Sequence, residues 1–119
     1  MTWKRKTPLN KFGARKVTYK GRMYDSQLEC GYAIVLADHL KAKRLIEVVP
    51  QFKVILMVEG HIICTHIPDF LVTLPDGRKK FVEAKGLPTD IWRIKRKLTE
   101  ALFPHIPYLT NPTDKQLFM

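Results

Sequence analysis

Hydrophobic and polar residues follow two different periods along this chain, and their order predicts a mixed α/β protein. Between about Ser26 and Arg44, apolar residues recur at helical spacing behind a Ser-x-x-Glu pattern that is typical of a helix start. A second helix is predicted from Asp90 to about Phe103, where Pro104 stops it. Its apolar stripe is expected to comprise Ile91, Ile94, Leu98, Ala101 and Leu102. Runs of β-branched and aromatic residues predict strands at about 46–49, 52–58, 61–66 continuing into Asp69, both arms of a hairpin over 69–85, and 106–110.

The hairpin carries the strongest local signal because its turn fixes its register. Pro75-Asp76-Gly77 is favourable turn chemistry, since Pro presets φ and Gly accepts a left-handed conformation. A three-residue loop of this kind makes Leu74 and Arg78 the closing pair. Counting back from that pair, Asp69 lies directly opposite Glu83, so the two side chains share one face of the sheet.

Lys85 lies two positions beyond Glu83 and is expected on the same face. Two opposed carboxylates with apolar neighbours repel unless a cation lies between them or one carboxyl keeps its proton. Paired oxygen ligands suit Mg²⁺, and a lysine beside the ion could position an attacking water. The alternative is a surface ion pair between Asp69 and Lys85, with Glu83 solvated.

Pro68-Asp69 followed by Glu83-Ala84-Lys85 resembles the signature of the PD-(D/E)XK nuclease superfamily. The resemblance implies that Asp69, Glu83 and the carbonyl of Ala84 hold Mg²⁺, with Mn²⁺ as a substitute, while Lys85 serves the water. It also implies a further acid on the first helix, for which Glu29 is the candidate. From the residues alone, Glu29 equally fits a capping role that complements the helix dipole.

More of the chain is similar to small phage- and prophage-borne proteins described as putative endonucleases, which are similar to phage junction-resolving enzymes. This similarity covers about residues 24–110. It implies a single-domain, restriction-endonuclease-like α/β fold with an αβββαβ core, in which helices flank a mixed central sheet. Residues 1–23 are then a basic N-terminal arm and residues 111–119 an irregular C-terminal tail. The segments that carry it are 25–29, Pro50-Gln51-Phe52, Pro68-Asp69-Phe70, 83–86 and the basic helix around 95–98.

Charge points to a polyanionic partner. The net charge is +10 over 119 residues, which favours DNA because each neutralised phosphate releases counterions. In the second helix the expected phosphate contacts are Arg93, Lys95, Arg96 and Lys97. In the arm they are Lys4, Arg5, Lys6, Arg15 and Lys16, with Trp3, Phe12 and Tyr19 available to stack on bases. The alternative for the arm is a disordered solubilising tail.

The remaining composition excludes several classes of protein. Two cysteines, Cys30 and Cys64, are too few for a disulfide framework, so reduced thiols in the cytoplasm of a bacterial host are expected for a phage-encoded chain. No stretch approaches 18 apolar residues, so no membrane-spanning segment is expected, and an anionic membrane surface is only the weaker alternative to nucleic acid as partner. Cys64 and His66 share a face of their predicted strand, and we expect ordinary strand residues there rather than a zinc site.

The sequence thus predicts a Mg²⁺-dependent DNA endonuclease that is structure-selective or nicking. Cutting two strands needs two sites and one domain of this size offers one, which favours a homodimer. The main alternative is a basic nucleic-acid-binding module without catalysis. The others are an RNA-directed nuclease and a structural partner in phage replication.

Overall fold

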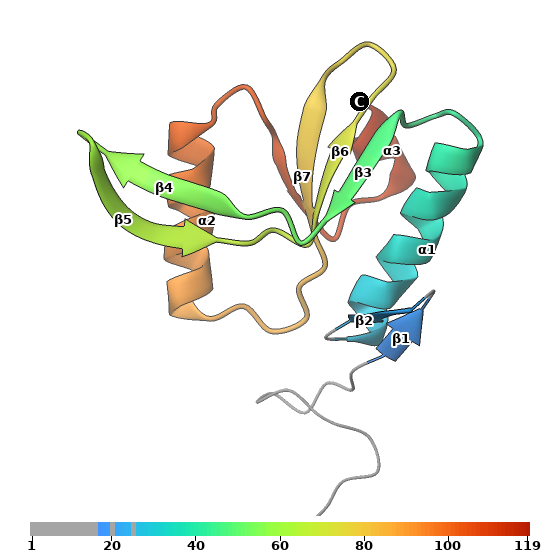
Figure 1. Ribbon diagram of the computed structural model, residues 1–119, viewed down its shortest axis with the longest axis horizontal. Helices are drawn as coiled ribbons and strands as arrows, with labels where there is room; N and C mark the ends of the chain where they lie inside the picture. The colour runs from blue at the N-terminus through green and yellow to red at the C-terminus, as the bar shows by residue number, and fades with distance from the viewer. Residues whose placement is uncertain (1–16, 20, 25) are drawn as a thin grey trace, which may run out of the picture.

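Eleven helices and strands are present in the computed structural model, which describes residues 17–19, 21–24 and 26–119. They are β1 (Val17–Tyr19), β2 (Arg22–Tyr24), α1 (Gln27–Lys41), β3 (Glu47–Pro50), β4 (Val54–Val58), β5 (His61–His66), β6 (Phe70–Thr73), β7 (Lys79–Glu83), α2 (Asp90–Leu102), β8 (Tyr108–Thr110) and α3 (Asp114–Phe118). Figure 1 shows their arrangement.

The central sheet has four strands in the order β3-β6-β7-β8. β3, β6 and β7 pair antiparallel, whereas β8 pairs parallel to β7, so the sheet is mixed. A parallel neighbour needs a crossover, and α2 supplies it between β7 and β8. Counted with α1 and α2, the strands of this sheet follow the predicted order of helix, three strands, helix and strand. The predicted α/β class, with a mixed sheet flanked by helices, is confirmed.

Each face of the sheet buries its own apolar cluster. On one face, Phe70 and Val82 pack with Leu36 of α1 and Leu117 of α3. On the other, Leu71 and Phe81 pack with β4 and with side chains of α2. The two clusters follow the alternation of each strand, because neighbouring residues point to opposite faces. The central sheet therefore lies between a layer of α1 and α3 and a layer of α2 and β4. The ends of its strands lie between the same two layers.

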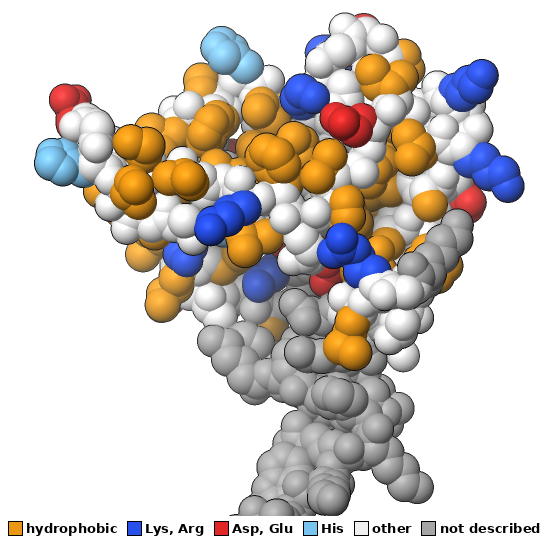
Figure 2. All heavy atoms as spheres, in the orientation of Figure 1, with side chains coloured by type: hydrophobic (Ala, Val, Ile, Leu, Met, Phe, Trp, Pro, Cys, Tyr) orange, Lys and Arg blue, Asp and Glu red, His pale blue; other side chains and the backbone are white. Residues whose placement is uncertain are grey.

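β4 and β5 form a separate two-stranded sheet rather than joining the central one. The expected continuation of β5 into Asp69 is wrong, because strand pairing stops at His66 and resumes only at Phe70. One face of this β4–β5 hairpin packs on α2 through residues such as Leu56. Figure 2 shows hydrophobic side chains gathered over the hairpin on the face turned to the viewer.

The C-terminal residues are not the irregular tail that the sequence predicted. α3 begins with a capping box in which Thr113 and Gln116 exchange hydrogen bonds. Leu117 is only 3% exposed and belongs to the core cluster beneath α1. The Nζ of buried Lys80 donates to the carbonyl of Met119 at 2.8 Å. Because five residues are short for a helix, this packing and capping stabilise what propensity alone would not.

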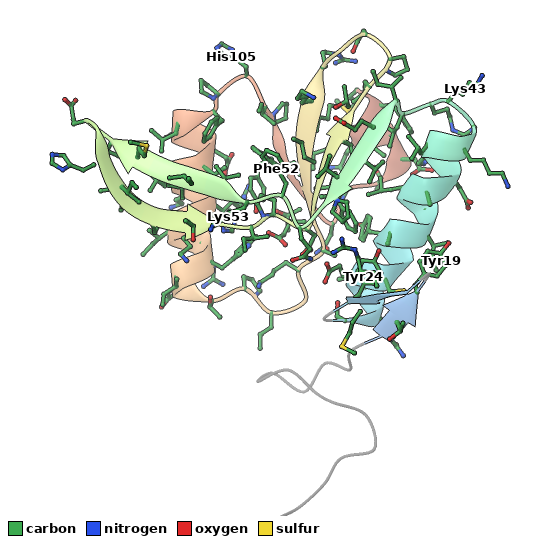
Figure 3. The ribbon with its side chains drawn as sticks, viewed as in Figure 1. Tyr19, Tyr24, Lys43, Phe52, Lys53 and His105 are labelled. Atoms are coloured by element: carbon green, nitrogen blue, oxygen red, sulfur yellow. The ribbon has the colours of Figure 1, made fainter. Side chains whose placement is uncertain are left out.

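Part of the predicted arm is a β-hairpin, formed by β1 and β2. Tyr24 is buried in the core cluster and Tyr19 packs against it, beside the first turn of α1 (Figure 3). Tyr19 thus packs partly against the core, and its expected stacking on bases stays a prediction. The other predicted contacts of the arm lie outside the described residues: Trp3, Lys4, Arg5, Lys6, Phe12, Arg15 and Lys16.

α1 ends at Lys41, three residues earlier than predicted. Lys43 has φ of 63°, a left-handed conformation that ends a helix. Over the described residues, no helix is long and apolar enough to cross a membrane.

Candidate active site

The predicted hairpin register is confirmed. Leu74 N–H donates to the Arg78 carbonyl at 2.8 Å, which closes the turn, and Gly77 has φ of 91°. Phe70 then pairs with Val82 at the other end of the ladder. One step further, Asp69 and Glu83 meet at the ends of β6 and β7.

Asp69 forms hydrogen bonds with both the backbone and the other carboxyl. Its Oδ2 accepts from Ala84 N–H at 2.8 Å, and its side chain is hydrogen-bonded to that of Glu83. Burial raises the pKa of Asp69 to about 10, and the bond to Glu83 and the charges of Glu83 and Glu29 add to this. Asp69 therefore keeps its proton at neutral pH and shares it with Glu83.

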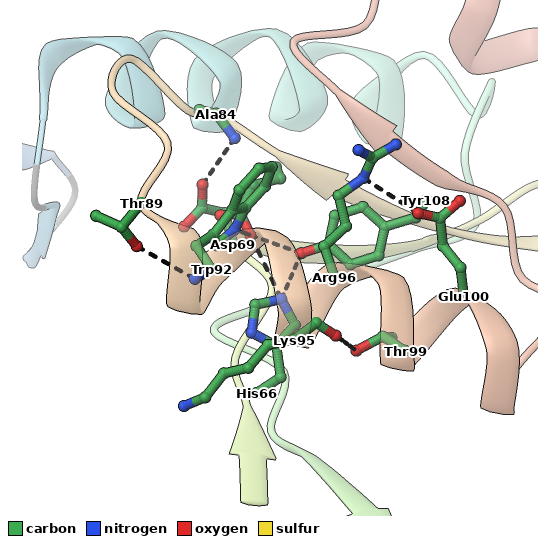
Figure 4. Close-up of polar contacts among 11 residues, drawn as sticks. His66, Asp69, Ala84, Thr89, Trp92, Lys95, Arg96, Thr99, Glu100 and Tyr108 are labelled. Atoms are coloured by element: carbon green, nitrogen blue, oxygen red, sulfur yellow. Dashed lines mark hydrogen bonds and ion pairs between the residues drawn. The ribbon is translucent and has the colours of Figure 1, made fainter.

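Glu83 is fixed by two donors that the sequence analysis did not identify. It is 5% exposed, and its Oε1 accepts from the Tyr108 hydroxyl at 2.6 Å and from Trp92 Nε1 at 3.0 Å. His66 Nε2 lies 2.6 Å from the same hydroxyl and 3.9 Å from Oε1 (Figure 4). Because the hydroxyl proton goes to Glu83, His66 is the donor to Tyr108, which places its proton on Nε2.

The protonation of this network follows from its burial. Burial lowers the pKa of His66, against the opposing effect of Glu83, and Lys95 and Lys85 lower it further. Burial and the charge of Glu83 raise the pKa of Tyr108. At neutral pH both rings are therefore uncharged, and they serve Glu83 as a chain of hydrogen-bond donors.

Glu29 combines the two roles that the sequence left open. Its backbone N–H donates to Ser26 Oγ at 3.1 Å, so it takes part in the N-terminal cap of α1. Its carboxyl is 2% exposed and accepts from Gln51 Nε2 at 2.6 Å. Gln51 N–H in turn donates to the Asp69 carbonyl at 2.7 Å. The backbone of Gln51 is left-handed, with a φ of 54°. Gln51 thus links the Glu29 carboxyl to the backbone of Asp69 by hydrogen bonds.

Lys85 lies just beyond the end of β7. Its Nζ is 5.4 Å from the centroid of the Trp92 ring, whose Nε1 holds Glu83. Asn111 fixes the Lys85 backbone, accepting from its N–H and donating to its carbonyl. The alternative that left Glu83 solvated is wrong, since Glu83 is buried.

α2 presents a different face to the core than its apolar spacing predicted. Ile91 and Ile94 are exposed, whereas Trp92 and Leu98 pack against the core and Thr99 is fully buried. The ring of Trp92 and the aliphatic stem of Arg96, four positions later, form part of the stripe that faces the core. Counting apolar residues alone does not detect such a stripe. The predicted basic residues of α2 divide accordingly: Lys95 and Arg96 are half-buried, and Arg93 and Lys97 are exposed.

Arg96 connects α2 to the buried network. Its guanidinium lies 5.9 Å from the Trp92 ring and 5.8 Å from the Tyr108 ring, and it pairs with Glu100 at 3.2 Å. Such stacking is favourable for a guanidinium over aromatic faces. Arg93 pairs with Asp90 at the start of α2. Arg96 therefore lies over the two rings that hold Glu83, while its own ion pair is with Glu100.

The donor chemistry at the Asp69–Glu83 pair suits a hard divalent cation. Within the described ranges, no group of three or more His, Cys, Asp or Glu side chains is already arranged to hold a metal ion. Mg²⁺ commonly uses one or two carboxylates and completes its shell with water and substrate oxygens. Two hydrogen-bonded carboxyls that share a proton fit that requirement.

Fold and site together define a small α/β protein in which Asp69 and buried Glu83 form an acidic pair at the ends of two central strands. The chain belongs to the family described as "Protein of unknown function (DUF1064)", whose model matches residues 9–111. No functionally curated protein matches it. The matched segment includes Glu29, Asp69, Glu83 and Tyr108 and ends before α3. The resemblance to PD-(D/E)XK nucleases stays a prediction.

Proposed function

We propose that this protein is a Mg²⁺-dependent DNA endonuclease, active on branched or nicked DNA in the cytoplasm of a bacterial host. The observation that carries the proposal is the close pair of Asp69, which is half-buried, and Glu83, which is buried; the pKa of Asp69 is raised to about 10. Burying two carboxyls face to face is unfavourable for stability, and such arrangements are typical of functional sites.

Within this proposal, Asp69 and Glu83 are the metal ligands, with the Ala84 carbonyl and Glu29 completing the site directly or through water. A bound Mg²⁺ would offset the negative charge that develops on a scissile phosphate. Tyr108 and Trp92 hold Glu83 Oε1 in a fixed orientation. Lys85 is the residue that positions the attacking water or accepts its proton.

The surrounding cations supply affinity for the phosphate backbone. Lys95 and Arg96 lie beside the buried network, and Arg93 and Lys97 extend along the exposed side of α2. Contacts of this type position DNA without reading its sequence, which favours recognition of DNA shape. The net charge of +10 adds to the attraction.

Cleavage of a four-way junction, a nicked plasmid and linear duplex, each with Mg²⁺, Mn²⁺ or EDTA, tests the proposal. We expect cleavage that EDTA abolishes and that Glu83→Gln lowers by about 100-fold or more. The matched control is Asp76→Asn, because Asp76 is an exposed carboxyl in the turn of the same hairpin. DNA affinity, measured by fluorescence anisotropy, should change little in either variant.

A second candidate is a nucleic-acid-binding module in which the carboxyls are purely structural. Its support is that Glu83 and Glu29 already accept hydrogen bonds from protein donors. It predicts DNA binding without cleavage under any metal condition. In that case Glu83→Gln would change only the thermal stability, and the nuclease proposal would be abandoned.

A further inference from the structure

The outer face of the β4–β5 hairpin exposes several large apolar side chains. Ile55 is 51% exposed and Ile62 is 66% exposed, although both lie within strands. A register shift between Leu56 and Met57 places an additional residue in β5, which helps to leave both Ile62 and Ile63 exposed. We call this the hairpin surface; it comprises Ile55, Met57, Val58, Ile62 and Ile63.

The charge of this segment excludes DNA as its partner. Residues 54–67 contain no Lys or Arg, although the chain has 21 of them, and contain one acid, Glu59. A surface that binds phosphates needs cations, and this one has none. In a chain of net charge +10, it is also where two copies could approach with the least repulsion.

From these observations we infer that the hairpin surface is the interface of a two-fold symmetric homodimer. The sequence of β4 and its flanks is self-complementary when read antiparallel to itself. Lys53 and Glu59 flank β4 at its two ends and are both exposed, with Ile55 and Met57 exposed between them (Lys53 is labelled in Figure 3). A two-fold axis near Leu56 brings Lys53 of each copy beside Glu59 of the other, and Ile55 beside Met57.

The size of the hairpin surface agrees with a second copy of the chain as its partner. Its five side chains expose roughly 400–500 Å² per chain, within the range of the largest patches on monomers, which are often functional. When the two hairpin surfaces and their flanking residues cover each other, roughly 1,000 Å² of accessible surface is buried in total. This is the lower bound of a specific interface. The pairing also requires the same patch on both partners, which is the property of a two-fold contact.

Sedimentation velocity of the full chain, from low to high micromolar concentration, tests the interface. We expect twice the chain mass at high concentration, and a dissociation constant raised roughly 100-fold by Ile62→Glu, because each dimer carries the substitution twice. The control is Ile46→Glu, since Ile46 is 56% exposed but lies just before β3, outside the hairpin surface. Thermal unfolding should show that both variants fold. A monomer at every concentration, or equal effects of both variants, overturns the inference.

A charge-exchange experiment tests the antiparallel arrangement itself. Lys53→Glu alone places two acids together at each end of the interface, and Glu59→Lys alone places two cations together. Each variant should therefore dimerise about tenfold less well, whereas an equimolar mixture should form heterodimers in which both ends are again paired. Native mass spectrometry distinguishes the species when one of the two variants is uniformly labelled with 15N, because the unlabelled variants have nearly equal masses. If the mixture pairs no better than either variant alone, this geometry is wrong.

The dimer does not depend on the proposed nuclease activity. It forms, or fails to form, without metal and without DNA. A dimeric protein that never cuts would leave the interface standing and remove the proposed function. A monomeric protein that cuts would do the opposite.

Discussion

Asp69 is a carboxyl that the fold holds in its neutral form. Its pKa rises from 3.8 to about 10, so the native state binds a proton more tightly than the unfolded chain does. Stability that depends on this proton is fully present below the unfolded pKa and is lost as pH rises toward 10. The native protein therefore loses stability across the neutral range because of this residue.

Replacing Asp69 with asparagine should stabilise the protein while abolishing cleavage. The amide keeps an acceptor for Ala84 N–H, offers a donor to Glu83 and carries no charge. We expect the free energy of unfolding to rise by roughly 1–3 kcal/mol at about pH 8, and by less at about pH 5. Urea titrations at the two pH values measure this. A less stable variant at pH 8 would mean that the carboxylate form is the favoured one.

Tyr108 is expected to matter to catalysis more than its stability contribution alone explains. Tyr108→Phe removes the donor to Glu83 Oε1 and the acceptor of His66, which should cost about 1–3 kcal/mol of stability. The matched control is Tyr32→Phe, because the Tyr32 hydroxyl donates to the Pro112 carbonyl away from the site. Cleavage rates and thermal melts of both variants decide the matter. Only Tyr108→Phe should lower the rate, and equal rates would reduce Tyr108 to a core residue.

At this scale the sequence predicted the residues whose positions depend on a single turn. Asp69 and Glu83 could be paired because Pro75-Asp76-Gly77 fixes the register between them. His66 and Tyr108 could not be assigned, since they meet only after two separate chain reversals. Their one sequence signal was that each is a ring with a polar atom within a predicted strand.

At the level of elements, α3 shows how packing overrides a weak local signal. Leu117→Ala should destabilise the protein by about 2–4 kcal/mol, because Leu117 fills the cluster between α1 and the sheet. Leu87→Ala is the control, since Leu87 is exposed in the loop before α2. Chemical denaturation of both variants measures the difference. Similar losses would mean that α3 does not contribute to the cooperative core.

Element types were predicted better than element faces and partners. The turn and capping residues identified α1, α2 and the 69–85 hairpin, because those signals are local. The β4–β5 pair was expected within one sheet, yet it packs separately on α2. α2 itself is rotated, because Trp92 and the stem of Arg96 cover the core in place of Ile91 and Ile94. Such choices depend on which surfaces meet in three dimensions.

For the whole molecule, a divalent ion at the site should act on global stability. Binding to the native state alone stabilises it by an amount that rises with the logarithm of one plus the ligand concentration divided by the dissociation constant, and the melting temperature rises with it. We expect Mn²⁺ to raise it, more at about pH 8 than at about pH 6, because the ion must displace the proton on Asp69. EDTA should reverse the effect.

Variants again supply the control for this measurement. Glu83→Gln should remove the Mn²⁺ effect, and Asp76→Asn should retain it. Stabilisation of all three proteins alike would place the ion elsewhere on the surface.

The parallel pairing of β8 with β7 has a consequence for synthesis of the chain. Glu83 leaves the ribosome well before Tyr108, and its support arrives only when α2 has crossed over and β8 has docked. A nascent chain shorter than about residue 110 therefore cannot assemble the acidic pair in its final form. A chain released before β8 is made therefore lacks the Tyr108 donor that holds Glu83.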